Sequence, residues 1–196
     1  LSFSSHFMGG ELTWICLKGG PNVGQYVFEL KVYRDCDGIT FSQTALTVTQ
    51  HNYPNLGATS PILMNFISVS DISPVGYSSG ASTSCFDCAG ITGAALGAVE
   101  EYIWRSDPIA FAGNPPPEGW HFIWGGGTRS GQITNILTPN SQSWTLRAVM
   151  YPYDSDPTPA INYLASSPCY DSSPRFKELA KTIICTGYPF AYSHNA

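Results

Sequence analysis

Two runs of alternating residues between Gly9 and Gly38, separated by a glycine- and proline-rich break, constrain the fold of this chain more than any other feature. Each run carries apolar side chains at every second position, namely Leu12, Trp14 and Cys16 in the first run and Phe28, Leu30 and Val32 in the second. Because successive side chains of a strand point to opposite faces, each run offers one apolar face to a core. The break at residues 18–24 supplies the permissive backbone that a chain reversal needs. The pattern predicts a β-hairpin that nucleates an antiparallel β domain.

Five further segments alternate or are rich in β-branched and aromatic residues, and they predict additional strands. They span residues 44–49, 62–70, 99–105, 120–124 and 143–151. The fourth is expected to end at the three glycines 125–127, which would form a tight turn. Long segments rich in glycine, proline and serine, among them residues 71–88, separate the strands. The pattern predicts the all-β class, whereas the order of the strands cannot be read from alternation.

The composition restricts the compartment and the kind of partner. Only 12% of the residues are charged, whereas 13% are aromatic and 43% are apolar, which is typical of a secreted or surface β protein with an ample core. The net charge of −5 argues against nucleic acid or an anionic membrane as the main partner. No apolar run approaches the roughly 20 residues that a membrane-spanning helix needs. We expect an exported, extracellular or cell-surface protein without membrane insertion.

The chain has six cysteines, which are Cys16, Cys36, Cys85, Cys88, Cys169 and Cys185. An even number of cysteines in a chain with few charges favours an oxidising compartment and up to three disulfides. Six cysteines allow 15 connectivities, and spacing alone does not choose among them. We expect one pair, Cys169 with Cys185, because these two residues flank a compact polar segment. The CxxC of Cys85 and Cys88 could serve redox chemistry or half a zinc site, but its serine- and glycine-rich surroundings favour a structural disulfide or an inert loop.

The sequence contains no catalytic motif of the GxSxG, HExxH, Walker A or GxGxxG type. Glu100 and Glu101 are adjacent, so on a strand they point to opposite faces and cannot flank one glycosidic bond together. The acidic pairs at 35–37 and 154–156 could hold calcium, yet neither has a third carboxylate at the spacing of a calcium loop. Aspartates that cap turns explain both pairs better. We expect a non-enzymatic protein with no catalytic residue, no metal ligand and no cofactor, calcium being the one candidate.

Three tryptophans, Trp104, Trp120 and Trp124, are candidates for contact with a ligand. Exposed aromatic rings stack on sugars, so a row of them would indicate a carbohydrate-binding surface. Packing in the core and at the rim of a β-sandwich is the competing explanation, and it needs fewer assumptions.

Several pieces of the chain resemble one known group of proteins. These pieces include HFMGGELTW, FELKVYRDCDG, VEEYIWRSDPI, PPPEGWHFIW, WTLRAVMYPY and ICTGYPFAYSHNA. In this order they are similar to the N-terminal region of large gliding-motility-associated surface proteins, which Bacteroidota secrete through the type 9 system and which carry a C-terminal sorting domain. The resemblance covers nearly the whole chain. It implies an exported, non-enzymatic β-domain protein that serves as an adhesin or as part of a surface filament.

The resemblance also implies a division of the chain, because residues 172–196 are similar to the opening strands of a cadherin-like domain. We expect an N-terminal β-sandwich at residues 1–165, followed at 166–196 by a linker and the opening strands of the next domain. The expected fold is an antiparallel Ig-like or cadherin-like β-sandwich with long Gly/Pro/Ser-rich loops.

Two functions are compatible with these observations. The first is a module for adhesion or gliding motility, which acts through protein–protein or surface contacts with other domains or subunits of a surface assembly. Because an incomplete domain leaves strand edges unpaired, residues 169–196 are expected to pack against a neighbouring domain or subunit. The alternative is a carbohydrate-binding module of a secreted polysaccharide-acting protein, with an extracellular glycan as its partner.

Overall fold

The computed structural model describes residues 7–35, 39–51, 61–72, 99–111, 115–129, 133–151, 169 and 172–175. Its strands are β1 (Phe7–Cys16), β2 (Tyr26–Asp35), β3 (Leu46–His51), β4 (Ile62–Asp71), β5 (Val99–Ser106), β6 (Trp120–Thr128) and β7 (Ser143–Met150). Within these ranges the only helical element is a single 3-10 turn, Pro139–Ser141. The predicted all-β class is confirmed, and no helix of the described residues is long and apolar enough to cross a membrane.

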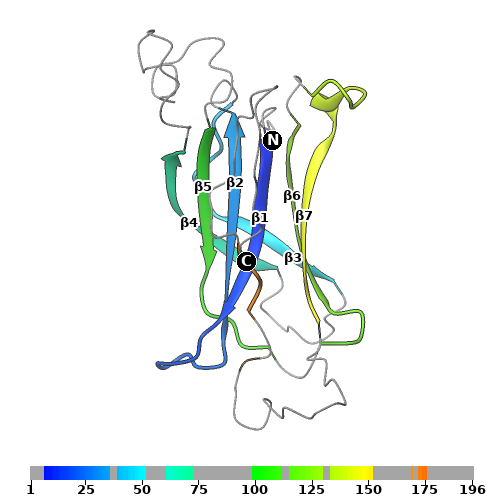
Figure 1. Ribbon diagram of the computed structural model, residues 1–196. Helices are drawn as coiled ribbons and strands as arrows, with labels where there is room; N and C mark the ends of the chain where they lie inside the picture. Colours follow the sequence, from blue (N-terminus) through cyan, green and yellow to red (C-terminus); the bar gives the residue numbers. More distant parts are fainter. Residues whose placement is uncertain are drawn as a thin grey trace, which may run out of the picture.

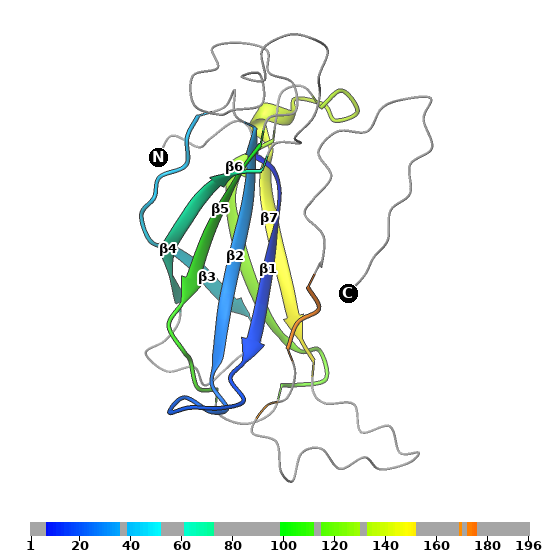
Figure 2. The ribbon, with the colours of Figure 1, turned by 60° about the vertical axis from the view of Figure 1, so that its left-hand side comes forward.

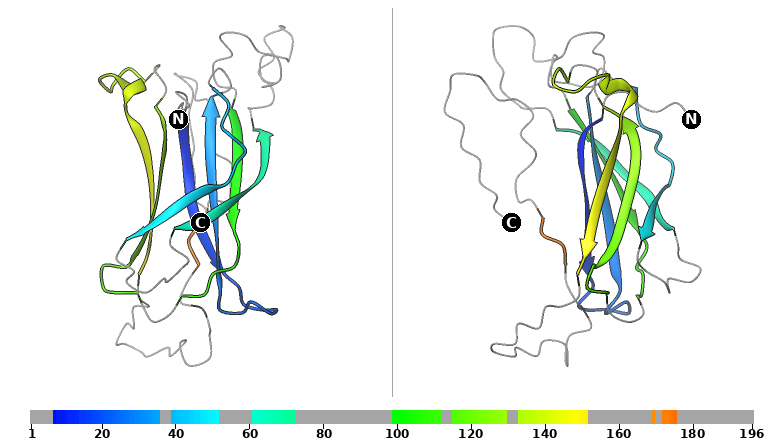
Figure 3. Two further views of the ribbon diagram at one scale, coloured as in Figure 1. Left: turned by 180° about the vertical axis from the view of Figure 1, so that it is seen from behind. Right: turned by 90° about the vertical axis from the view of Figure 1, so that its right-hand side faces the viewer.

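The strands form one antiparallel sheet in the order β1-β2-β5-β4-β3-β6-β7 (Figure 1). Strand β3 joins its two parts, because Leu46 to Val48 pair with β4 whereas Thr49 to His51 pair with β6. Seen from behind, β3 crosses diagonally from one part to the other (Figure 3). The sheet thereby curls until its outermost strands, β1 and β7, lie beside each other (Figure 2). The result is a nearly closed, barrel-like shape.

The interior is filled by the apolar faces that the alternation predicts. Every inward residue predicted for the central hairpin is buried, and these residues are Leu12, Trp14, Cys16, Phe28, Leu30 and Val32. Aromatic rings from distant strands meet here, with the centroids of Phe28 and Phe122 4.5 Å apart. The hairpin itself is confirmed, and its two strands pair from Phe7–Arg34 to Cys16–Tyr26.

The glycines 125–127 do not form the expected turn, so this prediction is wrong. Strand β6 continues through them to Thr128 and pairs with β7, with a bulge between Gly126 and Thr128. Gly127 has a φ of 65°, and a Cβ there would lie 3.2 Å from the Cβ of Phe7. Glycine marks a place where a strand bulges or another chain segment comes close. At this position, glycine allows β6 to continue through the bulge and allows Phe7, at the start of β1, to pack closely against it.

The other strand predictions are confirmed with small shifts at the ends. The predicted strand 44–49 begins two residues later than expected, at Leu46, and extends to His51. The segments 62–70, 99–105 and 143–151 coincide with β4, β5 and β7 to within one residue. Of the predicted loop 71–88, residues 73–88 lie outside the described residues.

Candidate functional site

A disulfide joins Cys16, the last residue of β1, to Cys169, with Cα atoms 5.7 Å apart and a sequence separation of 153. The expected pairing of Cys169 with Cys185 is therefore wrong, because a cysteine sulfur forms only one disulfide. The physical reason is that the chain around residue 169 returns to the end of β1, which spacing along the sequence cannot reveal. Both bonded cysteines are buried. The other four, Cys36, Cys85, Cys88 and Cys185, lie outside the described residues.

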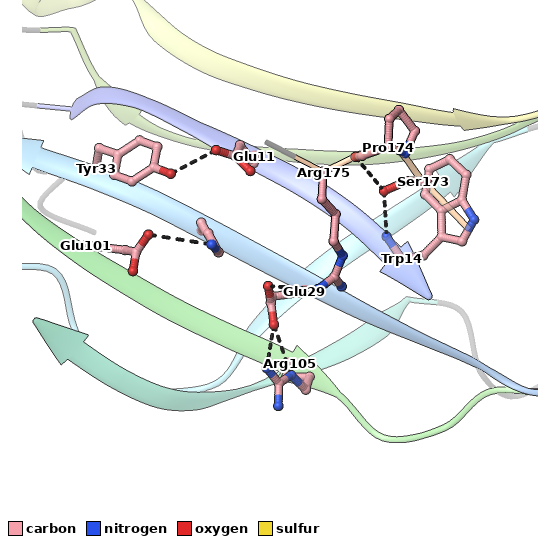
Figure 4. A network of polar contacts seen from close by, with 10 residues as sticks. Glu11, Trp14, Glu29, Tyr33, Glu101, Arg105, Ser173, Pro174 and Arg175 are labelled. Atoms are coloured by element: carbon pink, nitrogen blue, oxygen red, sulfur yellow. Dashed lines mark hydrogen bonds and ion pairs between the residues drawn. The ribbon is translucent and has the colours of Figure 1, made fainter. Parts of the chain in front are cut away.

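Residues 172–175, here called the edge segment, cover part of the free edge of β1. The backbone N–H of Ser173 donates to the carbonyl of Trp14 at 3.0 Å, and the N–H of Trp14 donates to Ser173 Oγ at 3.2 Å (Figure 4). The N–H of Cys16 donates to Ser172 Oγ at 3.1 Å. An exposed strand edge presents unpaired backbone groups, and these three bonds satisfy them over the last residues of β1.

A charged cluster on the outer face of β2 and β5 holds the far end of the edge segment. The carboxylate of Glu29 accepts a hydrogen bond from Arg105 Nε at 3.2 Å, and its other oxygen lies 3.9 Å from Arg175 (Figure 4). Lys31 lies 3.7 Å from Glu101 on the same face. Glu29 is only 6% exposed, so its paired charges are partly shielded from water. Arg175 thus ties the edge segment across β1 to β2.

Tyr33 belongs to the same outer face, and its hydroxyl donates to Glu11 Oε1 at 2.9 Å (Figure 4). Burial first, and then the nearby carboxylates of Glu11 and Glu101, raise the pKa of Tyr33 above its ordinary value of 10.0. The phenol therefore remains a hydrogen-bond donor at any physiological pH.

On the inner face, the buried guanidinium of Arg34 donates through Nε to Glu100 at 2.9 Å, and the hydroxyl of Tyr102 donates to the same carboxylate oxygen at 3.0 Å. Burial, and next the charge of Glu100, raise the pKa of Tyr102. Glu100 and Glu101 face opposite sides of the sheet, as predicted, since they pair with different cations. Because Arg34 and Tyr102 both bind Glu100, we interpret these three residues as a structural ion pair with an added hydrogen bond.

A groove of about 370 Å³ separates β1 from β7. Residues 10–14 of β1 form one wall and residues 146–149 of β7 form the other, while Ser173 and Pro174 of the edge segment close one end. The groove therefore lies along the seam where the curled sheet fails to close.

The three candidate tryptophans are all in the core. Trp104 is 0% exposed, Trp120 2% and Trp124 5%. The ring of Trp104 packs against Tyr102 and Phe66, with centroids 5.8 and 5.7 Å away. No exposed ring face remains for a ligand, so the ligand-contact prediction is wrong and core packing is the role that the structure assigns. The alternation of Trp120 and Trp124 on one face of β6 is the sequence signal for that role.

The described residues contain no group of three or more histidine, cysteine, aspartate or glutamate side chains placed to hold a metal ion. Asp35 ends β2, whereas residues 36–38 and 152–160, which include the other candidate calcium ligands, lie outside the described part. The calcium expectation stays a prediction, as does the domain boundary at residue 165. The described residues beyond that boundary are bound to β1 through the disulfide and the edge segment.

Sequence reasoning missed the features that define this region. Glu29, Ser173 and Arg147 carry no motif, and their placement depends on strand order and on the return of the chain to β1. No family model, curated protein or solved structure matches this chain.

Proposed function

We propose that this chain is a non-enzymatic module of a large, exported cell-surface protein of the adhesin or filament type, serving adhesion or gliding motility through protein–protein or surface contacts. The observation that carries the proposal is the disulfide between Cys16 and Cys169. It closes a covalent loop that contains nearly the whole domain, including strands β2 to β7.

The disulfide determines how a pulling force would pass through the domain. Tension applied between the two ends of the chain follows the covalent path from β1 through Cys16 to Cys169. The residues between these cysteines are bypassed, so force cannot extend them while the bond is intact. This arrangement suits a module that must keep its shape while a surface protein is under load.

The same bond supports the exported location, because disulfides persist in oxidising compartments and are rare in the cytosol. The resemblance of the ordered motifs to gliding-motility surface proteins supports the same location. An Ig-like or cadherin-like sandwich is the finer description that we propose for the fold. It is supported by the division of the sheet into two ladders, β1-β2-β5-β4-β3 and β3-β6-β7, which share β3.

Contact with other molecules is supported by exposed apolar side chains on β4, although the bulge between Phe66 and Ser68 places Val69 opposite Tyr102, on the other face from Leu63. Leu63, Ile67 and Val69 are 53%, 51% and 37% exposed, although β4 is an interior strand of the sheet. Apolar side chains gathered on one exposed strand are typical of a protein interaction surface.

Single-molecule force spectroscopy tests the proposal. The chain is stretched between reference domains, and wild type is compared with a Cys16→Ala/Cys169→Ala double variant. Releasing 153 residues at roughly 3.5 Å each should lengthen the unfolded variant by up to about 50 nm relative to wild type. Equal contour lengths in the two proteins would refute a load-bearing role for this bond.

A further inference from the structure

The groove between β1 and β7 contains backbone groups that no described residue pairs with. In the regular ladder from Gly9 to Cys16, the backbone groups of alternate residues point to the same side of the strand. Trp14 and Cys16 point toward the edge segment, so Leu12 and Gly10 point to the same free edge. Among the described residues, neither Leu12 nor Gly10 has a hydrogen-bond partner on that side. No described residue pairs with this part of the edge, which can therefore accept another strand.

The edge segment shows that this edge accepts an extended chain. Ser172 and Ser173 bind Cys16 and Trp14 in turn, so the segment runs antiparallel to β1. The next residue, Pro174, lines the end of the groove. Arg175 then reaches across to Glu29 on the outer face of β2. The open stretch continues directly from the covered one.

The walls of the groove indicate the chemistry of what would fill it. Leu146 and Ala148 provide apolar surface beside Leu12. Arg147 also lines the groove, is exposed, and has no ion-pair or hydrogen-bond partner among the described residues. An unpaired guanidinium at a groove with free backbone donors and acceptors is complementary to an extended peptide that carries a carboxylate.

We propose that this groove binds an extended segment of a partner polypeptide, which adds a short strand to the open edge at Gly10 and Leu12 and places an acidic side chain against Arg147. The inference rests on the proposed contact function and names its partner. Residues 10–14 of β1 line the groove, and Trp14 is already paired with Ser173, so the remaining length at about 3.3 Å per residue suits a strand of about four residues.

The test is a titration of the full chain, with nuclear magnetic resonance detection of backbone amides. The probe is the peptide acetyl-Thr-Val-Glu-Val-Thr-amide, and its control carries lysine in place of glutamate. The protein variants are Arg147→Glu and, as a matched control, Lys18→Glu, which reverses the charge of an exposed residue in the β1–β2 loop. The titration does not depend on the response to force, so either proposal can fail without the other.

The expected result is that the glutamate peptide shifts the amides of Gly10 and Leu12 and slows their hydrogen exchange. Arg147→Glu should weaken this binding by about tenfold and make the lysine peptide the better ligand, whereas Lys18→Glu should change nothing. Equal binding of the two peptides, or shifts confined to other strands, would overturn the proposal. The proposal would also be overturned if protection of these amides from hydrogen exchange increased with the concentration of the chain itself and did not change with either peptide. The occupant of the groove would then be a second copy of the chain.

Discussion

Removal of the Cys16–Cys169 disulfide should be among the most destabilising changes that the domain can suffer. The bond closes a loop of 153 residues, and the chain-entropy model assigns such a loop about 5 kcal/mol at 25 °C. Alanine is the replacement of choice at both positions, because the two cysteines are 6% and 8% exposed and a buried serine hydroxyl would need a hydrogen-bond partner.

A second, local effect accompanies the loss of the bond. The edge segment makes three hydrogen bonds to β1, each worth about 1 kcal/mol net. Fixing the backbone of its four residues costs about 1–2 kcal/mol per residue. Without the covalent tie the cost exceeds the gain, so the segment should leave the edge. The amides of Trp14 and of residue 16 should then exchange faster with solvent even where the rest of the domain stays folded.

Urea unfolding under non-reducing conditions measures the global effect. With a slope of about 2 kcal/mol per molar, a loss of 5 kcal/mol lowers the midpoint by about 2.5 M. The single variants Cys16→Ala and Cys169→Ala each break the same loop, so each should lose as much as the double variant does. If the stability losses of the two single variants add up to the loss of the double variant, or if the midpoint shifts by less than about 0.5 M, the sulfurs stabilise by packing and not by closing the loop.

Three further predictions concern the rest of the fold. Gly126→Ala should cost about 2 kcal/mol in thermal unfolding, because its Cβ would lie 2.8 Å from a buried tryptophan ring, whereas Gly125→Ala, with no atom closer than 3.8 Å, should be tolerated. Glu100→Ala should cost about 3 kcal/mol in urea unfolding, because it removes the carboxylate that pairs with the buried guanidinium of Arg34, and a change below 1 kcal/mol would contradict the structural role. Because the pKa of Tyr33 is raised, the stability that its phenol contributes is complete below pH 10.0 and declines above it. An alkaline titration followed by tyrosinate absorbance checks this prediction. If the Tyr33→Phe variant lacks one tyrosine that titrates normally in the wild type, the prediction is contradicted.

The strands could be predicted from the sequence because alternation is a local property. The inward faces of β1 and β2 needed only the period of two at Leu12 to Cys16 and Phe28 to Val32. The glycines at 125–127 misled the prediction, because the same residue type serves a turn and a bulge, and the choice depends on Phe7 arriving from a distant part of the chain. The local pattern contains no information about that arrival.

The contacts of the candidate site could not be predicted, because each depends on strand order or on a return of the chain. Glu29 lies on what alternation marks as the solvent face, yet it is 6% exposed and has Arg105 and Arg175 within reach. Arg105 is its neighbour only because β5 pairs with β2, across two intervening strands in sequence. Likewise, Cys169 lies much nearer in sequence to Cys185 than to Cys16, but only the fold brings a partner to it.

The edge of β1 has to meet two opposed requirements, and the position of the disulfide reconciles them. A long open edge invites uncontrolled pairing between chains, whereas a fully covered edge can recognise nothing. Because the covalent tie is at the very end of β1, it holds the edge segment over Trp14 and Cys16 and leaves Gly10 and Leu12 open. At the other end of the edge, the carbonyl of Phe7 accepts a hydrogen bond from Trp144 Nε1 at 3.1 Å. Among the described residues, the open stretch is therefore bounded at one end by a covalent bond and at the other by this contact, which makes it long enough for one short peptide strand and too short to template a sheet.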